Sequence, residues 1–515
     1  MQLTNQLQQH FNYKQFRPGQ KEIIEQVLQG NDVLGILPTG SGKSLCYQLP
    51  SLILPDLTVV ISPLISLMID QVRETKAFHI KEVVALHSMQ SYEERHVILQ
   101  QLHRYKIVYI SPELIQNNAI AHALEKRKIS LFVIDEAHCI SQWGYDFRPD
   151  YLRLQHVLDS LNNPPVLALS GTITKRIEND ILEELQRPAM KVFKHRTDRE
   201  NITLIVEHIE STKTKDKRLC ELIHKYNVPM IIYFSSRKQA EEIAHFIATE
   251  LPDKHVAYYH GGLDQESRLK IQQQFLYNQL QIICATSAFG MGINKSNVRM
   301  VVHYHLPSQK ESFIQEIGRA GRDGEQSVSI VLYQDGDEYI PQQLIEHELP
   351  TEREIRSFFN YLYKLHKQTQ RLPNVVESTA NILDIDEIKV NFLRYQLEMR
   401  HMVRNNQIMY DYKRWTNALY EITEYCEARK RVKFANFDRL FQYISTGTCL
   451  RIELYKDFQQ QIEKQVENCC SSCGYEEDML DEDIIDENHV EEHSWRCQLA
   501  YLFGVGEKNE STKIN

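Results

Sequence analysis

Residues 131–148 read LFVIDEAHCISQWGYDFR, and this stretch decides the fold class. The apolar run Leu131–Ile134 is typical of a strand buried in a parallel sheet, where both faces are covered. Asp135 and Glu136 follow at its end, where two carboxylates suit a Mg²⁺ ligand and a base that activates water. The next residues include aromatic and basic groups that stack on nucleobases or bind phosphates. The stretch therefore indicates nucleotide chemistry and a nucleic-acid sensor on one loop, as a molecular motor requires.

Short apolar runs alternate with longer helical patterns on both sides of this stretch, and they fall into two blocks. In the first block the expected strands are Val33–Leu37, Thr58–Ile61, Val83–Leu86, Lys106–Ile110, Leu131–Ile134 and Val166–Leu169. In the second block they are Met230–Phe234, His255–Tyr258, Gln281–Cys284, Met300–Tyr304 and Val328–Tyr333. A polar stretch around Lys194–Asn201 separates the blocks. The alternation predicts two α/β units with parallel sheets and a ligand-binding cleft between them.

After about Asp337 the pattern changes to long amphipathic helices. We expect Pro350–Arg404 to form two helices around a small core, and a helix-turn-helix-like DNA contact is the alternative. The expected units are residues 1–198 and 199–340 for the two α/β domains, 341–425 for the helical region, 426–475 for a cysteine-rich metal-binding region and 476–515 for an acidic tail.

The net charge of −10 is concentrated in one segment. Residues 474–493 carry ten acidic side chains and no Lys or Arg, so 59 acidic and 59 basic residues remain elsewhere in the chain. A neutral body can present a basic groove on one face, so the overall charge does not exclude a nucleic-acid partner. We expect the acidic run to be solvated, with an interaction tail as the alternative.

The sequence carries no export or membrane signal that we recognise. The first ten residues, MQLTNQLQQH, lack the basic segment and apolar core of a signal peptide. The apolar stretch around Leu57–Ile69 is interrupted by Ser62, Pro63 and Ser66, so it is too short and too polar to span a bilayer. We therefore expect a cytoplasmic protein with no membrane partner, whose ten cysteines are thiols and metal ligands rather than disulfides.

Residues 37–44 read LPTGSGKS and lie between an expected strand and a helical pattern. The first of them is Leu where the strict phosphate-binding loop has Gly, but the working parts remain. Gly40 and Gly42 allow backbone N–H groups to approach phosphates. Lys43 reaches the β- and γ-phosphates, and the Ser44 hydroxyl is placed to bind Mg²⁺. With the two carboxylates after the later strand, this loop predicts ATP and Mg²⁺ as cofactors.

Residues 315–324 read QEIGRAGRDG and place Arg319 and Arg322 three positions apart at the end of an expected helix. On its own such a pair is usually a solvated face. Beside a phosphate-binding loop in the other block, arginines that reach across the cleft would neutralise charge on a transferred phosphoryl group. The expected catalytic residues are therefore Lys43, Asp135, Glu136, Arg319 and Arg322.

These motifs, together with YKQFRPGQ at residues 13–20, resemble those of the RecQ family of superfamily 2 DNA helicases over roughly residues 10–475. The resemblance implies two tandem RecA-like domains followed by a mainly helical zinc-binding region. It also implies that Tyr13 stacks on adenine while Arg17 and Gln20 read its edge, and Gln is a bidentate partner for adenine N6 and N7. A turn that caps the first helix is the alternative. The implied nucleotide-binding residues are Tyr13, Arg17, Gln20, Thr39, Gly40, Gly42, Lys43 and Ser44.

Further segments carry the resemblance into the expected nucleic-acid groove and cleft. They read VVISPLISLM at 59–68, YISPEL at 109–114, YHGGL at 259–263 and AFGMGINK at 288–295. Their Ser and Gly residues suit sequence-independent contacts with a phosphate backbone. In the aromatic-rich loop, the resemblance implies that DNA binding is coupled to hydrolysis through His138, Trp143, Phe147 and Arg148.

The sequence departs from the family pattern at two places. Tyr145 stands where the family usually has His, so coupling of DNA binding to hydrolysis is expected to be tuned differently. Residues 168–174 read ALSGTIT in place of a Thr-Ala-Thr core. Ser170 and Thr172 keep their hydroxyls, so hydrogen bonding between hydrolysis and unwinding segments stays available.

Four cysteines near the end of the second half suggest a structural metal site. The spacing Cys470-x-x-Cys473 turns two thiolates toward one ion, and four thiolates complete a tetrahedral zinc site. The resemblance implies Cys449 on a helix and a Cys-rich knot as ligands. The adjacent pair Cys469-Cys470 is not the usual family spacing, so Cys426 is the alternative to Cys469 as the remaining ligand.

The resemblance implies an ATP-dependent helicase that moves 3′ to 5′ on DNA and unwinds duplexes in replication, recombination and repair. Single-stranded and duplex DNA are the expected partners, with single-strand-binding or repair proteins as further candidates and a nucleoid location if the source is bacterial. Two rivals stay open: an RNA helicase, and a DNA-stimulated ATPase that acts as a scaffold with little unwinding.

Overall fold

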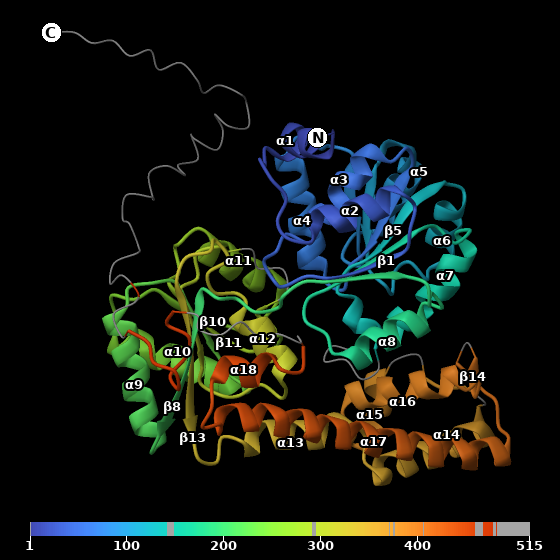
Figure 1. Ribbon diagram of the computed structural model, residues 1–515. Helices are drawn as coiled ribbons and strands as arrows, with labels where there is room; N and C mark the ends of the chain where they lie inside the picture. Colours follow the sequence, from blue (N-terminus) through green and yellow to red (C-terminus); the bar gives the residue numbers. More distant parts are fainter. Residues whose placement is uncertain are drawn as a thin grey trace.

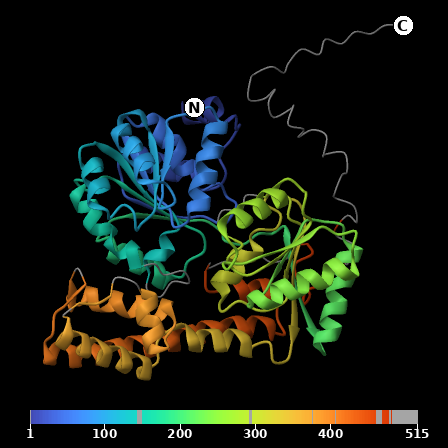
Figure 2. The same ribbon diagram turned by 180° about the vertical axis from the view of Figure 1, so that it is seen from behind.

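The computed structural model describes residues 2–141, 149–290, 295–369, 371–373, 376–404, 406–458, 467–476 and 480. Two α/β domains lie side by side, and a helical arm extends below them (Figure 1). The view from behind shows the same three bodies, with the arm along the lower edge (Figure 2). The expected fold class, two parallel sheets followed by a mainly helical part, is confirmed.

The first sheet has seven strands in the order β3-β4-β2-β5-β6-β1-β7, and all neighbouring pairs are parallel. Its strands are β1 (Val33–Ile36), β2 (Leu57–Ile61), β3 (Val83–Leu86), β4 (Ile107–Ile110), β5 (Ile129–Ile134), β6 (Val166–Ser170) and β7 (Lys191–Lys194). All six expected strands are present. The edge strand β7 was not expected, because it begins and ends with exposed lysines and its two middle residues are only half-buried.

Helices cover both faces of the first sheet (Figure 1). They are α1 (Gln2–Phe11), α2 (Gln20–Leu28), α3 (Leu45–Ile53), α4 (Ile65–Ala77), α5 (Tyr92–Gln100), α6 (Asn118–Glu125), α7 (Leu154–Ser160) and α8 (Lys175–Glu184), with 3₁₀ turns η1 (Leu102–Arg104), η2 (Ala137–Ile140) and η3 (Pro149–Arg153). Along β5, Phe132 and Ile134 pack into one core, whereas Leu131 and Val133 pack into a core on the other face. Burial on both faces explains why this strand is a continuous apolar run.

The second sheet has six parallel strands in the order β10-β11-β9-β12-β13-β8. They are β8 (Ile202–Ile209), β9 (Met230–Tyr233), β10 (Val256–Tyr259), β11 (Ile282–Ala285), β12 (Met300–His303) and β13 (Ser327–Gln334). Its helices are α9 (Thr212–Lys225), α10 (Arg237–Glu250), α11 (Gln265–Leu276) and α12 (Lys310–Ile317). The edge strand β8 was not expected. It follows the polar linker directly and pairs with β13 along its whole length.

The arm contains more structure than the two helices expected for Pro350–Arg404. Its elements are α13 (Tyr339–Glu348), α14 (Glu352–Gln368), α15 (Val376–Leu383), α16 (Glu387–Met399), the hairpin of β14 (Val403–Arg404) and β15 (Gln407–Ile408), and the first part of α17 (Tyr412–Ile444). Arg371 forms a further bridge with Gln407 on the hairpin. The order of α14, bridge, α15, α16 and hairpin matches that of a winged helix-turn-helix.

The 33-residue helix α17 connects the arm to the second domain. Its first half supplies Trp415 and Cys426 to the core of the arm, and its second half supplies Leu440 and Ile444 to a core of the second domain. The domain boundary expected at residue 425 therefore lies inside one continuous helix. After it, α18 (Leu450–Tyr455) packs into the same core of the second domain.

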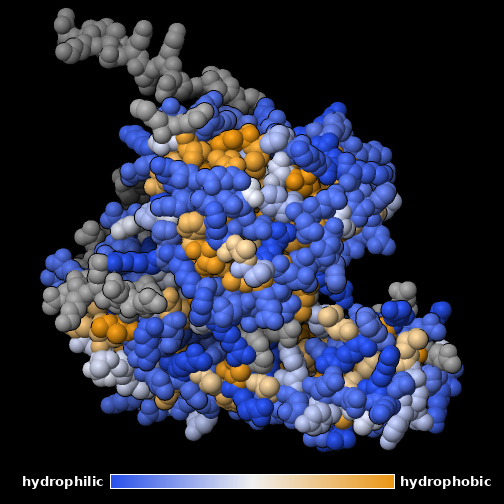
Figure 3. All heavy atoms as spheres, turned by 45° about the vertical axis from the view of Figure 1, so that its right-hand side comes forward, coloured by the Kyte–Doolittle hydropathy of each residue, from blue (hydrophilic) through white to orange (hydrophobic). Residues whose placement is uncertain are grey.

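The arm projects from a largely hydrophilic surface, with a hollow between it and the body above (Figure 3). Its contact with the first domain includes Arg153 of η3, whose guanidinium lies 3.6 Å from the Glu398 carboxylate on α16 and over the Tyr395 ring. Within the described residues, no helix is both long and apolar enough to cross a lipid bilayer.

Candidate nucleotide-binding and metal sites

The phosphate-binding loop lies between β1 and α3, as its sequence predicts. Gly40 and Gly42 have φ angles of +83° and +76°, a conformation that L side chains rarely adopt. A Cβ on Gly42 would lie 2.9 Å from the Gln20 amide nitrogen. Glycine is therefore required by both the backbone conformation and the packing of the loop.

Two adjacent carboxylates face this loop from the end of β5. The Lys43 ammonium lies 3.3 Å from the Glu136 carboxylate. Burial, and then the charge of Glu136, raises the pKa of Asp135 to about 6. Burial alone would raise the pKa of Glu136, but Lys43 and His138 outweigh it and hold that pKa below its usual value. Glu136 is thus kept ionised as a base requires, while Asp135 and the Ser44 hydroxyl are oxygen donors suited to Mg²⁺.

The two domains together line a cavity of about 350 Å³ around these groups. The first domain contributes Thr39, Lys43, Ser44 and both carboxylates, and the second contributes Gly290, Gln315, Arg319 and Arg322. A cavity of this size lies within the usual range for small-molecule and cofactor sites. The structure therefore brings together all the expected catalytic residues, although they come from both halves of the chain.

The expected adenine-binding residues line the same cavity. Tyr13 is half-exposed, and its ring meets the edge of Phe78, a residue that sequence reasoning did not single out. Gln20 is buried, and its amide donates to the backbone oxygens of Ser41 at 2.8 Å and Gly42 at 3.0 Å. In this structure Gln20 thus ties the segment to the phosphate-binding loop, and its contact with adenine stays a prediction.

Arginine side chains from both domains line the cavity near the phosphate-binding loop. Arg319 and Arg322 lie in the turn after α12, and the Arg319 side chain donates to the Gly290 carbonyl. Burial, and then the neighbouring guanidinium groups of Arg319 and Arg199, lowers the pKa of Arg322 to about 9. Crowded, partly desolvated cations favour a polyanion between them, so the donor set fits the phosphates of a nucleotide.

His138 connects the carboxylates to the altered ALSGTIT segment. Its Nδ1 lies 3.1 Å from the Ser170 hydroxyl and 3.3 Å from the Glu136 carboxylate. Because Ser170 ends β6 and Glu136 follows β5, His138 links the ends of these two strands. The hydroxyl of Ser170 therefore makes a hydrogen bond of the kind that the sequence left available.

The remaining expected DNA-coupling residues, Trp143, Phe147 and Arg148, lie outside the described residues, as does Tyr145. Tyr151, which follows this stretch, is hydrogen-bonded to the backbone of the carboxylate pair: its hydroxyl donates to the Asp135 carbonyl at 3.1 Å. Sequence reasoning did not identify Tyr151. Its position 16 residues from Asp135 offered no spacing signal.

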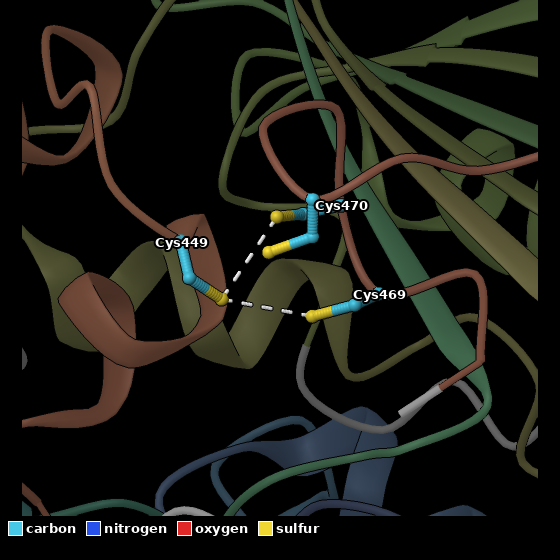
Figure 4. Close-up of side chains that lie close together, drawn as sticks. Cys449, Cys469 and Cys470 are labelled. Atoms are coloured by element: carbon cyan, nitrogen blue, oxygen red, sulfur yellow. Dashed lines mark hydrogen bonds between the residues drawn. The ribbon is translucent and has the colours of Figure 1, made fainter. Parts of the chain in front are cut away.

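The sulfurs of Cys449, Cys469, Cys470 and Cys473 all lie within 4.8 Å of one another. Figure 4 shows the Cys449 sulfur facing those of Cys469 and Cys470, at 3.6 and 3.9 Å. A tetrahedral Zn²⁺ with bonds of about 2.3 Å requires sulfurs about 3.8 Å apart, so the cluster fits zinc. Cys426 instead lies in the core of the arm, so the structure places the Cys469 sulfur, and not that of Cys426, beside the other three. The role of these four cysteines as zinc ligands stays a prediction.

Two family models match the chain: DEAD/DEAH box helicase over residues 17–180 and the helicase conserved C-terminal domain over residues 214–324. The chain is 38% identical over 512 residues to the probable ATP-dependent DNA helicase RecS of Bacillus subtilis, which covers 98% of this chain and 99% of RecS. It is 39% identical over 348 residues to the ATP-dependent DNA helicase RecQ of Haemophilus influenzae, which covers 67% of this chain and 55% of that protein. The chain thus aligns with nearly all of RecS and about half of RecQ.

The solved structures support the fold. The DEAD-box helicase Mss116 bound to ssRNA and UDP-BeF superposes with a TM-score of 0.56 at 17% identity, covering 89% of this chain and 90% of that chain. At this identity the match establishes the arrangement of the two α/β domains and nothing about the substrate.

Proposed function

The chain belongs to the RecQ family of ATP-dependent DNA helicases, and we propose that it uses ATP hydrolysis to move 3′ to 5′ along one strand and separate duplex DNA. The observation that carries the proposal is the shared cavity. Lys43 and Glu136 enter it from the first domain, and Arg319 and Arg322 enter it from the second. A nucleotide bound there would contact both domains, so its hydrolysis would change how firmly they are held together.

Each side chain has a role that follows from its position. Glu136 would orient and deprotonate the attacking water, and Lys43 would leave its ion pair with Glu136 to bind the γ-phosphate. Asp135 and Ser44 would hold Mg²⁺, which when bound offsets the negative charge of the phosphates. Arg319 and Arg322 would stabilise the charge that develops on the transferred phosphoryl group.

Coupling to DNA is proposed to run through the loop that follows the carboxylates. Trp143 and Phe147 would stack on bases, and Arg148 would bind the backbone. DNA binding by these side chains would then affect Glu136 through the short stretch that contains His138. His138 contacts both Glu136 and Ser170.

The arm is proposed to contact duplex DNA ahead of the separating strands. Its order of elements is that of a winged helix-turn-helix, a fold that presents one helix and one hairpin to DNA. This proposal takes up the helix-turn-helix alternative that the sequence of Pro350–Arg404 left open. The cysteine cluster would hold a structural Zn²⁺ beside the second domain. We place the activity in the cytoplasm, with single-strand-binding or repair proteins as proposed partners.

A strand-displacement assay tests the proposal directly. Duplexes with a 3′ tail, a 5′ tail or a fork, and a tailed RNA duplex as control, are incubated with the protein, ATP and Mg²⁺. We expect unwinding of 3′-tailed and forked DNA and little unwinding of 5′-tailed DNA or RNA. Preference for a 5′ tail would show that the protein moves in the opposite direction. Preference for RNA would show that RNA, and not DNA, is the substrate.

A second candidate, a DNA-stimulated ATPase that acts as a scaffold, is favoured by the altered segment at residues 168–174 and by Tyr145. Both departures lie where hydrolysis is coupled to strand separation. Strong DNA-stimulated hydrolysis without displacement of any tailed duplex would select this candidate.

A further inference from the structure

Arg451 is a buried cation in α18, and no role was assigned to it from the sequence. Its side chain is 1% exposed and forms an ion pair with Asp198. It donates to the backbone oxygens of Arg199 at 3.0 Å and Ile202 at 2.5 Å, and to that of Cys469 at 3.4 Å. One guanidinium therefore joins the cysteine cluster to the linker between the two sheets.

The cysteine cluster is also tied to the strand that follows this linker. The backbone N–H of Leu204 donates to the Cys469 carbonyl at 3.3 Å, and the N–H of Ser471 donates to the Leu204 carbonyl at 2.9 Å. The Thr203 hydroxyl donates to the Asn468 carbonyl at 2.7 Å. The cysteine cluster thus continues the hydrogen bonding at β8, the edge strand of the second sheet. The same hydrogen bonds therefore fix the geometry of the cluster and the path of the linker into β8.

At its other end the linker reaches the nucleotide cleft through Arg199. The Arg199 guanidinium donates to the Thr39 carbonyl of the phosphate-binding loop at 3.3 Å. It also donates to the carbonyls of Ala320 at 3.2 Å and of Gly321, which lie between the two cleft arginines. The Asn201 side chain supports the same turn by donating to Gly321 at 2.9 Å. Arg199 therefore bonds to both domains at once.

We propose that Arg451 and Arg199 are positioning residues that couple the cysteine cluster to the nucleotide cleft. The Cys469 carbonyl in the cluster accepts a hydrogen bond from Arg451, and Arg451 in turn binds the linker. Arg199 in the linker then joins the turn at residues 319–322 to the phosphate-binding loop. Metal in the cluster then controls hydrolysis as well as the stability of its own region. The inference rests on the proposed ATP-driven function and adds a regulator to it.

The physical reason is that one bond of Arg199 joins the two domains. Its bonds to Ala320 and Gly321 lie on the second-domain side, whereas its bond to the Thr39 carbonyl forms only when the first domain is within reach. That bond stabilises the closed cleft and not an open one. An interaction made mainly in the reactive, closed arrangement affects kcat more than KM. Loss of Arg199 is therefore expected to slow turnover while ATP still binds.

The first experiment compares Asp198→Asn and Arg199→Ala with a matched linker control, Arg196→Ala. Arg196 is half-exposed and forms an ion pair with the exposed Glu200 at 3.6 Å. We expect either test variant to lower DNA-stimulated kcat about 10-fold, as for the loss of one or two charge-assisted hydrogen bonds, with KM for ATP within about 3-fold. The control should match the wild type. Elemental analysis should find the wild-type zinc content in all three variants.

The second experiment measures hydrogen exchange with and without removal of zinc by a chelator. In the wild-type protein, removal should speed exchange in residues 195–203, and also in the distant segments 37–44 and 318–324. Arg199→Ala should show the faster exchange in those two distant segments before any chelator is added. Chelation should lower the kcat of the wild-type protein to that of Arg199→Ala. It should lower the kcat of Arg199→Ala by no more than about 2-fold, because the effects of two changes in one connected network do not add.

Three results would overturn the relay: wild-type kcat in Arg199→Ala, independent losses from chelation and Arg199→Ala, or faster exchange after chelation confined to residues 449–476. The exchange measurement needs no catalysis. It therefore tests the relay even if hydrolysis or unwinding is absent, so failure of the relay and failure of the proposed function are distinguishable.

Discussion

The nucleotide cleft is built from charged groups held around a cavity, whereas the cysteine cluster is built from four sulfurs held nearly in contact. In the cleft, Lys43 pairs with Glu136 and Arg319 with the Gly290 carbonyl. These contacts engage part of the charge in the cleft, and the crowded arginines still favour a polyanion. In the cluster, four sulfurs lie within 4.8 Å of one another, and as thiolates they would repel without a cation. We therefore expect the cleft to fold without its nucleotide, and we expect the cluster to need a bound metal for its structure.

The largest expected effect concerns the cleft. Lys43→Ala or Glu136→Gln should lower the kcat for ATP at least ~10²-fold, because each removes a group that acts on the γ-phosphate or the water. DNA binding should stay near wild type, because neither side chain is assigned a contact with DNA. Steady-state hydrolysis and DNA binding by anisotropy measure both. The exposed carboxylate variant Glu125→Gln is the control, and wild-type turnover in Glu136→Gln would refute the assignment.

The cluster should show the opposite behaviour. Cys473→Ser should lose zinc and make residues after about Lys430 protease-sensitive while both sheets stay folded, because metal binding supplies folding free energy to that region. Elemental analysis should find about one zinc per wild-type chain, as one tetrathiolate site predicts.

Cys426→Ser is the matched control for the cluster and should retain zinc, since Cys426 lies in the core of the arm. Zinc-free protein purified without chelators would contradict the site. Loss of zinc from Cys426→Ser with retention in Cys469→Ser would show that the ligand set is wrong.

An intermediate effect is expected where the cleft meets DNA. Trp143→Ala or Phe147→Ala should leave basal hydrolysis intact and reduce its stimulation by single-stranded DNA, by about 10-fold if one stacked base is lost. Tyr145→His should change stimulation only modestly. ATPase titrations with single-stranded DNA measure this, and unchanged stimulation in both Ala variants would mean that these aromatics only pack in the protein.

The smallest effect is a pH dependence of the Mg²⁺ requirement. The pKa of Asp135 is raised to about 6, so this carboxyl gains a proton as the pH falls through that value. Protons then compete with Mg²⁺, and the Mg²⁺ concentration for half-maximal hydrolysis should increase a few-fold per pH unit below about 6. The same burial disfavours the ionised form in the folded state, so in the absence of Mg²⁺ stability should decrease as the pH rises from the usual Asp range toward 6. A flat Mg²⁺ requirement across this range would remove Asp135 from the metal site.

The strands that the sequence missed share a physical cause. The middle strands of each sheet are buried on both faces and read as apolar runs, as β5 does. The edge strand β7 is exposed at both lysine ends, and β8 directly follows a polar linker and is only half-buried or exposed in its second half. Their place in the sheets depends on backbone pairing with a neighbour, which no local pattern reports. The hairpin of the arm was missed because β14 and β15 are two residues each, too short for a local pattern to show.

Local sequence patterns were enough to predict the chemical groups of the protein, which are the phosphate-binding loop, the carboxylate pair after β5, the two arginines and the cysteine pair at 470 and 473. Each is a short motif whose residue types are dictated by the group it binds, so local spacing is sufficient. Which distant groups meet depends on the fold. Packing brings the Cys469 sulfur beside those of Cys449, Cys470 and Cys473, Phe78 beside Tyr13, and Arg451 onto the linker. These contacts depend on how separate elements pack and not on any spacing along the chain.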